Sequence, residues 1–396
     1  MPTRIVLFSH DSVGLGHVKR NLAIAHALGR HLPRLTGNPV AGLLITGESD
    51  ATDFDRPAGW DWLVVPGITR TGDGYAPRHL PMGMSRVAAL RGTLVRAALE
   101  SFAPDLVIID RHALGVRREL ESALTQLRVT NPGCRVVLGL REVLDAPEAA
   151  ELEWQRIGGV RTITSLFDAI WVYGDRGVHD PVASGEIPAE LSHLVEYTGY
   201  LAHGRPERAE PVCSEPFVLT MVGGGSDGYD LARAAAAAPI PDGYRHLVVT
   251  GRQMRQGDQD KVAAAAAPGT EVVEWVDQAL SLARRAAAVV CMGGYNTISE
   301  IMTTTTPALV VPRCVRRQEQ RIRAATLARR SAIDTLPTQQ AQPATIGEWI
   351  ARRVGDRVAR NGIDLGGLAR VPELAAGLLE RPDDVTDTTM GAAHVV

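Results

Sequence analysis

The chain has 396 residues, which exceeds one ordinary domain and is comfortable for two. Hydrophobic residues make up 45% and charged residues 22% of the sequence, which is typical of a globular protein. The 42 basic and 45 acidic residues give a net charge of −3, which excludes a general basic excess of the kind that binds nucleic acid. We therefore expect no nucleic-acid partner.

Strand and helix patterns alternate along the first half of the chain. Short β-branched runs predict strands at Arg4–Ser9, Gly42–Thr46, Trp62–Pro66, Asp105–Asp110, Arg135–Leu140 and Asp168–Tyr173. Helical periodicity predicts one helix that begins near Val18 and two more at Val87–Phe102 and Val116–Leu127. Continuous apolar strands with helices between them indicate a parallel sheet that is covered on both faces.

A second alternation follows a break at Leu201–Pro216, where glycine, prolines and charges are typical of a linker. Its predicted strands are Phe217–Val222, Arg245–Thr250, Glu271–Glu274, Ala287–Met292 and Ala308–Val311, and its predicted helices are Tyr229–Ala238, Gln278–Ala286, Thr297–Thr304 and Gln318–Arg330. We therefore predict an α/β chain with two Rossmann-like, doubly wound domains that face each other across a cleft. The predicted N-terminal domain spans 1–203, the linker 204–216 and the C-terminal domain 217–365. A helix at 366–380 is predicted to pack back on the first domain, and a flexible tail follows at 381–396.

Cysteine usage and the N-terminus bear on the cellular compartment. No two cysteines form a C-x-x-C pair, and their spacing fits neither a disulfide scaffold nor a zinc site. The N-terminus, MPTRIVLFSH, enters a strand pattern without a signal-peptide pattern. No apolar run approaches the ~20 residues of a membrane-spanning helix, which leaves peripheral membrane contact open. We expect a cytoplasmic protein, and the sequence does not distinguish a monomer from a homodimer.

The loop after the first predicted strand, HDSVGLGH, lies where open α/β sheets bind ligands, beyond the carboxyl end of the strand. Gly16 lets the backbone approach a ligand closely. A neutral His17 at the helix start can take a proton from an acceptor hydroxyl, with Asp11 or Asp110 to orient it or take its place. The alternative is that His17 caps backbone groups of the helix.

Two glycine loops in the second half favour a diphosphate. Gly223, Gly224 and Gly225 follow the strand FVLTMV and expose successive N–H groups, which can form an anion-binding nest before a helix. The alternative is an interdomain turn that needs positive φ. Gly293 and Gly294 follow a later strand and give the same close approach to a ligand.

Polar side chains follow the second glycine loop. Asn296 or Thr297 is expected to cap the next helix. One turn into that helix, Glu300 can accept two hydrogen bonds from a ribose diol; the alternative is a capping box with Thr297. In the basic segment after the following strand, Glu319 and Gln320 can bind sugar hydroxyls, and most of the arginines are expected at the surface.

These motifs resemble a known group of enzymes. The stretches AVVCMGGYNTISEI…PALVVP and GLGHVKRNLAIAHAL resemble the donor domain and first glycine-rich loop of the N-acetylglucosaminyltransferases that complete lipid II in peptidoglycan synthesis. PDLVIIDRHALGVRREL, LREVLDAPE, WVYGD and TGY resemble a related bacterial group of predicted glycosyltransferases. The resemblance implies the GT-B fold, a nucleotide-diphosphate sugar as co-substrate, with UDP preferred, and neither a bound metal nor a resident cofactor.

The resemblance also implies roles for residues of the donor site. Glu300 would hold the ribose, and Val276 would present its backbone to the nucleobase. Glu319 and Gln320 would bind the donor sugar. The phosphates would be lined by Gly223–Gly225, Gly293, Gly294, Asn296 and Thr297.

The expected reaction is inversion by direct displacement, with His17 as the base and Gly16 and Arg252 beside the donor diphosphate. The sequence departs from the lipid II enzymes where Gln-Glu-Gln replaces their paired glutamines, and Gly67–Arg86 shows no match to them. We therefore predict a small-molecule acceptor, such as a secondary metabolite. The alternatives are a nucleotide-sugar 2-epimerase of the same fold and a non-catalytic nucleotide-sugar-binding protein.

Overall fold

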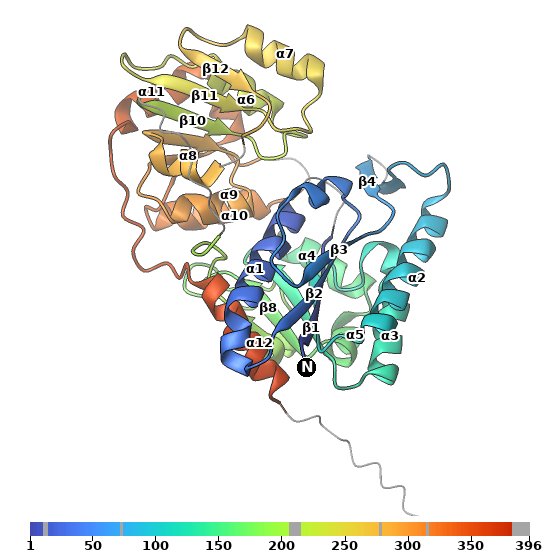
Figure 1. Cartoon of the computed structure of the whole chain (residues 1–396). Coiled ribbons are helices and arrows are strands. Elements are labelled where there is room, and N and C mark those ends of the chain that lie inside the picture. The colour runs from blue at the N-terminus through green and yellow to red at the C-terminus, as the bar shows by residue number, and fades with distance from the viewer. Residues whose placement is uncertain (11–14, 72–73, 206–214, 277–278, 314–316, 382–396) are drawn as a thin grey trace, which may run out of the picture.

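Two parallel sheets occupy the two halves of the chain (Figure 1). The computed structural model describes residues 1–10, 15–71, 74–205, 215–276, 279–313 and 317–381. In Figure 1 the blue-to-green sheet forms one domain and the yellow-to-orange sheet forms the other. This arrangement confirms the predicted α/β fold with two Rossmann-like domains.

The first sheet has the strand order β3-β2-β1-β6-β7-β8-β9, and all of its pairings are parallel. The strand order reverses between the neighbours β1 and β6, so the loops after these two strands form a switch point, where ligands bind in open sheets. The strands are β1 (Thr3–Phe8), β2 (Val40–Thr46), β3 (Trp60–Val64), β6 (Leu106–Asp110), β7 (Arg135–Arg141), β8 (Ala169–Tyr173) and β9 (Val195–Tyr197).

Alternate residues of the first sheet point to opposite faces, and both faces are covered. Ile5 and Leu7 of β1 belong to one buried cluster with α1, whereas Val6 and Phe8 belong to another with α2, α3 and α5. A strand that is buried on both faces has no polar alternation, which explains the continuous apolar runs. The helices are α1 (Gly16–Thr36), α2 (Met84–Phe102), α3 (Glu121–Thr130), α4 (Pro147–Arg156) and α5 (Gly159–Leu166).

The second sheet repeats this plan with the order β12-β11-β10-β13-β14-β15, again parallel, and its switch point lies between β10 and β13. Its strands are β10 (Phe217–Met221), β11 (Arg245–Val249), β12 (Thr270–Val273), β13 (Ala288–Cys291), β14 (Ala308–Val310) and β15 (Asp334–Thr335). Its helices are α6 (Tyr229–Ala236), α7 (Gln256–Ala264), α8 (Ala279–Arg285), α9 (Tyr295–Met302), α10 (Glu319–Arg329) and α11 (Pro343–Arg353).

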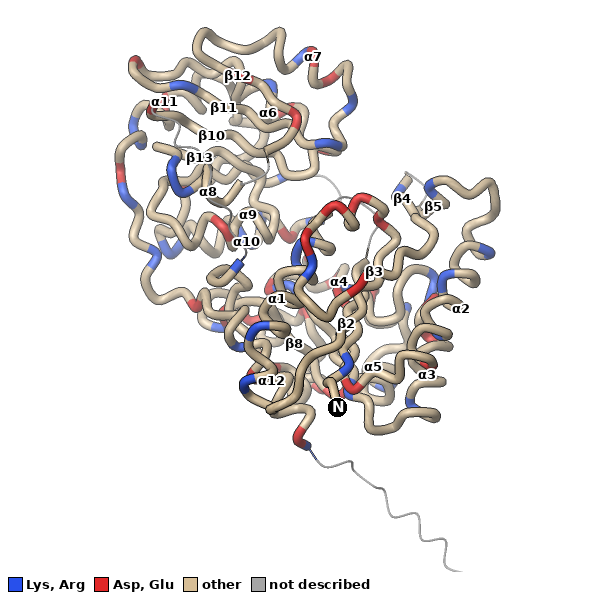
Figure 2. Tube along the Cα trace, viewed as in Figure 1, with Lys and Arg blue, Asp and Glu red and all other residues tan. Residues whose placement is uncertain are grey.

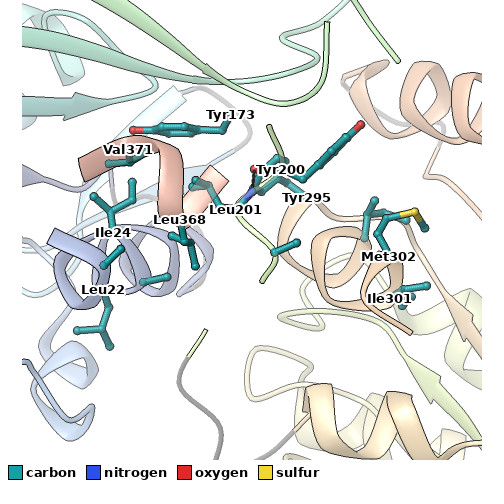
Figure 3. Close-up of a cluster of buried hydrophobic side chains, with 14 of the residues drawn as sticks. Leu22, Ile24, Tyr173, Tyr200, Leu201, Tyr295, Ile301, Met302, Leu368 and Val371 are labelled. Carbon is teal, nitrogen blue, oxygen red and sulfur yellow. Dashed lines mark hydrogen bonds between the residues drawn. The ribbon is translucent and has the colours of Figure 1, made fainter. Parts of the chain in front are cut away.

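Helix α12 (Gly367–Leu379) follows the second sheet in the chain but packs against α1 of the first domain (Figure 1). Figure 3 shows Leu368 and Val371 of α12 near Leu22 and Ile24 of α1, within one buried apolar cluster. The last described helix therefore contributes to the core of the first domain.

Several elements carried too little local signal to be predicted, namely α4, α5, α7, α11, β9, β15 and an antiparallel hairpin of β4 (Ile68–Thr71) and β5 (Gly74–Pro77). Helix α7 illustrates the cause, because Val262 is the one residue that it buries, so it shows no apolar periodicity. The helix predicted from Val116 begins later, because Arg117 and Arg118 have left-handed φ values of 51° and 60°.

Candidate active site

The loops at the first switch point bring a histidine and two charged side chains together. His17 is the second residue of α1, and its Nδ1 lies 2.6 Å from Oδ2 of Asp110, the last residue of β6. Arg20, one turn along α1, donates from Nη2 to both carboxylate oxygens of Asp110 at 2.7 Å. The structure therefore places His17 and Asp110 in contact, whereas Asp11 lies outside the described residues.

The charges around His17 determine where its proton lies. Burial raises the pKa of Asp110, but Arg20 and His17 outweigh that effect and hold this pKa well below its usual range. Burial lowers the pKa of His17, and the charge of Asp110 opposes that effect only in part. Nδ1 of His17 lies 2.8 Å from Nη2 of Arg20 but closer, at 2.6 Å, to the ionised Asp110. We therefore assign the tautomer in which a neutral His17 donates its Nδ1–H to Asp110 and keeps Nε2 as a proton acceptor.

Two further histidines adjoin His17. The ring of His10, which follows β1, lies 4.0 Å from that of His112 and 5.4 Å from that of His17 between centroids. Burial lowers the pKa values of His10 and His112 well below the usual value, so these imidazoles are neutral at neutral pH. Sequence reasoning missed both residues, although each stands just past the carboxyl end of a switch-point strand, and that position could have singled them out.

The two predicted glycine loops follow β10 and β13, the strands of the second switch point. Gly223, Gly225 and Gly293 have φ values of 67°, 94° and 80°, a region that favours glycine. A Cβ atom at Gly225 would lie 2.3 Å from the carbonyl oxygen of Thr250, so no side chain fits there. The backbone has the shape that an anion-binding nest needs, and the phosphate assignment of these loops stays a prediction.

The helix after the second glycine loop starts earlier than predicted. Helix α9 begins at Tyr295, its N-cap is Gly294, and no side chain caps it. The expected capping by Asn296 or Thr297 is therefore wrong, because both residues lie inside the first turn. The unpaired N–H groups of this first turn are the ones that an anion would meet.

Glu300 and Asn296 share a partner from the start of the linker. Arg205 donates from Nη1 to Oε1 of Glu300 at 3.4 Å and from Nη2 to Oδ1 of Asn296 at 3.0 Å. Nδ2 of Asn296 donates in turn to the carbonyl oxygen of Gly16 at 2.8 Å. Because no side chain caps α9, the capping-box alternative for Glu300 with Thr297 is excluded. Asn296 therefore joins α9 to the start of α1.

Arg252 and Val276 lie at the carboxyl ends of β11 and β12. The Arg252 guanidinium carbon lies 4.2 Å from the ring centroid of Trp275, which is 37% exposed. The neighbouring Val276 is half-buried against the apolar core. Trp275 is an aromatic residue that sequence reasoning passed over, although it directly precedes Val276 in the EWVDQAL stretch.

Glu319 and Gln320 are buried at the start of α10 and are held by arginines. Oε2 of Glu319 lies 2.6 Å from Nη2 of Arg141 in the first domain, and Oε1 lies 3.5 Å from Nη2 of Arg313. Burial raises the pKa of Glu319, but the arginines outweigh this effect and lower the pKa to about 2. Oε1 of Gln320 accepts a bond from the backbone N–H of Arg313 at 3.1 Å. Both predicted sugar ligands are therefore fixed by protein partners.

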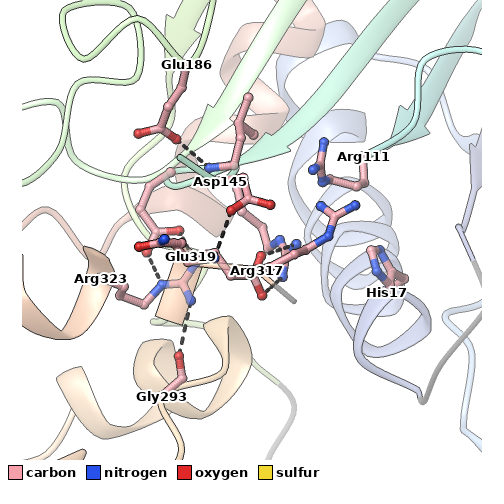
Figure 4. A network of polar contacts seen from close by, with 12 residues as sticks. His17, Arg111, Asp145, Glu186, Gly293, Arg317, Glu319 and Arg323 are labelled. Atoms are coloured by element: carbon pink, nitrogen blue, oxygen red, sulfur yellow. Dashed lines mark hydrogen bonds and ion pairs between the residues drawn. The ribbon is translucent and has the colours of Figure 1, made fainter. Parts of the chain in front are cut away.

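Arginines of the segment around α10 join the two domains. Figure 4 shows Arg323 directed toward the carbonyl of Gly293, to which its Nη1 donates at 3.1 Å. Its Nε lies 2.5 Å from Oε1 of Glu142 in the first domain. Arg317 donates to Oε1 of Glu153 at 2.8 Å. The expectation that most arginines of this segment lie at the surface is therefore wrong for Arg313, Arg317 and Arg323.

The charges are distributed over the whole molecule: Figure 2 shows basic and acidic residues scattered over both domains. Among the described residues, no group of three or more His, Cys, Asp or Glu side chains has the arrangement of a metal site. Within the same part of the chain, no helix is both long enough and apolar enough to cross a membrane.

Comparison with known sequences links the second domain to a family. Residues 219–356 match the model of the glycosyltransferase family 28 C-terminal domain. Two relatives are named UDP-N-acetylglucosamine--N-acetylmuramyl-(pentapeptide) pyrophosphoryl-undecaprenol N-acetylglucosamine transferase. The one from Rhizobium etli is 26% identical over 148 residues, which is 36% of this chain and 40% of that protein. The one from Mesorhizobium japonicum is 32% identical over 149 residues, which is 34% of this chain and 39% of that protein. The chain therefore matches about two fifths of the length of these relatives.

Comparison with solved structures covers nearly the whole chain. The structure of the glycotransferase of kitacinnamycin superposes with a TM-score of 0.60 at 17% identity, over 96% of this chain and 99% of that chain. At this identity the likeness shows the fold. The chain thus has the GT-B fold, and its residues 219–356 are similar to the C-terminal domain of glycosyltransferase family 28.

Proposed function

We propose that this chain transfers a sugar from a UDP-linked donor to a hydroxyl group of a small-molecule acceptor. One observation carries the proposal: Asn296, in the first turn of the donor helix, donates to the carbonyl oxygen of Gly16, which adjoins His17. The proposed base and the proposed phosphate site are therefore neighbours, as a direct displacement requires.

The proposed reaction is a single displacement with inversion at the anomeric carbon. Nε2 of His17 accepts the proton of the acceptor hydroxyl, and the acceptor oxygen forms the new bond to the anomeric carbon. The bond from that carbon to the diphosphate breaks, and its electron pair leaves with the diphosphate oxygen. The N–H groups of the glycine loop at Gly223–Gly225 and of the first turn of α9 stabilise that charge.

Two findings support a UDP-linked donor. The family match covers the second domain, and both relatives that it resembles carry UDP-N-acetylglucosamine in their names. Trp275 and Val276 follow the carboxyl end of β12, where a nucleobase would bind. Glu300 lies one turn into α9, where a carboxylate can accept hydrogen bonds from a ribose diol.

The β4–β5 hairpin, close to the first switch point, supports a small-molecule acceptor. The β4–β5 hairpin brings Tyr75 to 6.1 Å from His10 between ring centroids, and His10 lies 5.4 Å from His17 by the same measure. The pyrophosphoryl-undecaprenol acceptor named for the relatives is the rival substrate class, and the glycotransferase of kitacinnamycin provides a precedent for the same fold in a natural-product setting.

Release of UDP during turnover tests the proposal. UDP-N-acetylglucosamine and UDP-glucose are each mixed with the purified chain and with phenolic, aminocoumarin, polyketide and undecaprenyl-pyrophosphoryl acceptors, in buffer that contains EDTA. We expect UDP release and a mass increase of one hexose or N-acetylhexosamine on a small-molecule acceptor. Glu300→Gln should raise the donor KM about tenfold, because a charge-assisted contact is lost. Glu348→Gln, on α11 of the same domain, is the matched control.

The other outcomes separate the alternatives. Conversion of the donor without any acceptor identifies a 2-epimerase. Binding of UDP without turnover of any acceptor identifies a binding protein. Transfer to the undecaprenyl acceptor alone contradicts the proposed acceptor class, and loss of activity in EDTA contradicts a metal-independent reaction.

A further inference from the structure

Arg205 begins the linker, and its side chain is directed inward rather than to solvent. Its side chain is 7% exposed, and that of its partner Glu300 is 17% exposed. The Nε of Arg205 donates to the carbonyl oxygen of Leu201 at 2.7 Å, and the backbone N–H of Leu201 donates to the hydroxyl of Tyr295 at 3.1 Å. Arg205 is therefore tied to Leu201, and Leu201 is tied in turn to the first residue of α9.

The contacts of Arg205 continue as a chain to the base. One end of its guanidinium meets Glu300 and the other meets Oδ1 of Asn296, whose Nδ2 meets the carbonyl of Gly16. Both ends of the Asn296 amide are engaged, so a displacement of Arg205 cannot occur without a change at one of these bonds. Gly16 immediately precedes His17, whose Nδ1 is held by Asp110.

We propose that Arg205 and Asn296 are positioning residues that couple binding of the donor ribose at Glu300 to the placement of His17. The inference rests on the proposed function, because it takes Glu300 as the ribose ligand. Arg205 would hold one oxygen of the carboxylate so that the other faces the diol, and Asn296 would transmit the position of Arg205 to the turn that carries the base. The base would thus reach its working position only when a nucleoside diphosphate with an intact ribose is bound.

The chemistry of Arg205 explains why the residue type matters. A guanidinium offers separate N–H groups in a fixed plane and can meet Glu300 and Asn296 together, whereas an ammonium is a single point charge. Arg205→Gln should therefore remove the coupling, and Arg205→Lys should keep the charge beside Glu300 but lose the contact with Asn296. If Arg205→Gln does not fold, Arg205→Lys alone can still test the coupling.

Calorimetry with two probes tests the ribose end of this series of hydrogen bonds. UDP and 2′-deoxy-UDP are titrated into the full-length wild type, Arg205→Gln, Arg205→Lys and Asn296→Ala. We expect the wild type to prefer UDP by about tenfold, since one charge-assisted bond to the 2′-hydroxyl is at stake. Arg205→Gln should bind UDP about tenfold more weakly and lose most of the preference. Asn296→Ala should keep the preference for UDP over 2′-deoxy-UDP, because its side chain does not touch the ribose.

NMR of the His17 ring tests the base end. The His17 signal is assigned by its loss in His17→Gln, and its pH titration is recorded with and without UDP. We expect UDP to shift the titration of His17 in the wild type and to have no effect on it in Arg205→Gln, Arg205→Lys and Asn296→Ala. Matched controls are Asn131→Ala, which removes an amide-to-carbonyl bond of 2.8 Å far from the site, and Arg245→Gln, which removes an exposed ion pair; both should behave as wild type.

The outcomes separate this inference from the proposed function. A wild type that binds neither probe overturns the UDP donor and, with it, the coupling. A wild type that prefers UDP, with Glu300→Gln impaired but Arg205→Gln unchanged, leaves the donor site standing and overturns the role of Arg205. A His17 signal that responds to UDP equally in Asn296→Ala and in the wild type overturns the connection to the base.

Discussion

The two switch points of the molecule present different chemistry. In the first domain, the chain after β1 and β6 presents side chains: Arg20 pairs with the buried Asp110, and Nδ1 of His17 contacts the same carboxylate. In the second domain, the loops after β10 and β13 present mainly backbone groups: Gly223, Gly225 and Gly293 have positive φ. An added Cβ atom would lie 2.3 Å from a backbone oxygen at Gly225 and 2.6 Å from the Val310 side chain at Gly293. The same strand order therefore presents ionisable side chains at one switch point and glycine backbone at the other.

Because of this difference, the two switch points should be sensitive to different kinds of substitution. A buried ion pair depends on the presence of both partners, because the survivor becomes an uncompensated charge. A glycine loop depends on conformation, because its binding groups are amides that every residue possesses. Charge-neutralising changes should therefore harm the first switch point most, and added Cβ atoms should harm the second.

The largest effect is expected for Asp110→Asn, which leaves Arg20 buried without its counter-ion. The free energy of unfolding should fall by about 3–5 kcal/mol, as for other broken buried ion pairs. Urea unfolding measures the change. Glu121→Gln removes an exposed ion pair with Arg118 and should cost about 1 kcal/mol or less. Equal losses in the two variants would show that Asp110 is not charged in the folded protein.

The next effect concerns turnover. His17→Ala should lower kcat by roughly 10² or more, because general-base catalysis contributes at least that much. The affinity for UDP should change little, since the His17 side chain contacts Asp110 and is not among the proposed donor ligands. Steady-state kinetics with calorimetry of UDP binding check both statements. An unchanged kcat would transfer the role of base to an aspartate.

Histidines in both domains should make the fold sensitive to acid. Burial lowers the pKa of His246 to about 4, below the ~6.5 of an unfolded histidine, so the unfolded state binds the proton first. Stability is therefore complete above pH ~6.5 and falls as the pH drops toward the folded-state pKa. Between pH 7 and pH 5 the wild type should lose about 2 kcal/mol more than His246→Gln does.

Unfolding measurements at a series of pH values give this difference. His193→Gln, at an exposed position, serves as the control and should keep the wild-type slope. His10, His17 and His112 lie in the other domain and also have lowered pKa values, so part of the acid sensitivity should remain in His246→Gln. A slope that is identical in His246→Gln and the wild type would contradict the buried, neutral state of His246.

The smallest effect is expected at the second switch point. Gly225→Ala places a Cβ atom 2.3 Å from a backbone oxygen at a φ of 94°, which should cost about 1–3 kcal/mol and weaken UDP binding. Gly257→Ala lies inside α7 with nothing within 4 Å of the added atom and should stabilise by about 0.5–1 kcal/mol. Thermal unfolding and UDP titration compare the two. Unchanged UDP affinity in Gly225→Ala would remove this loop from the phosphate site.

The sequence predicted the glycine loops and the strand alternation because both signals are local. Three successive glycines after an apolar strand specify a backbone shape without reference to distant residues. The contact of His17 with Asp110 could be offered only as one of two options, because it joins residues 93 positions apart through the pairing of β1 with β6. The partners of Glu300 and Glu319 were out of reach for the same reason: Arg205 and Arg141 come from the linker and the other domain.

The packing of α12 against α1 has a consequence for synthesis of the protein. Leu368, Val371 and Ala375 are fully or almost fully buried, and they cover the helix whose first turn carries His17. A nascent chain emerges from its N-terminus, so the apolar face of α1 stays uncovered until the whole second domain and α12 have been synthesised. During that interval a chaperone, rather than the chain itself, would have to shield α1.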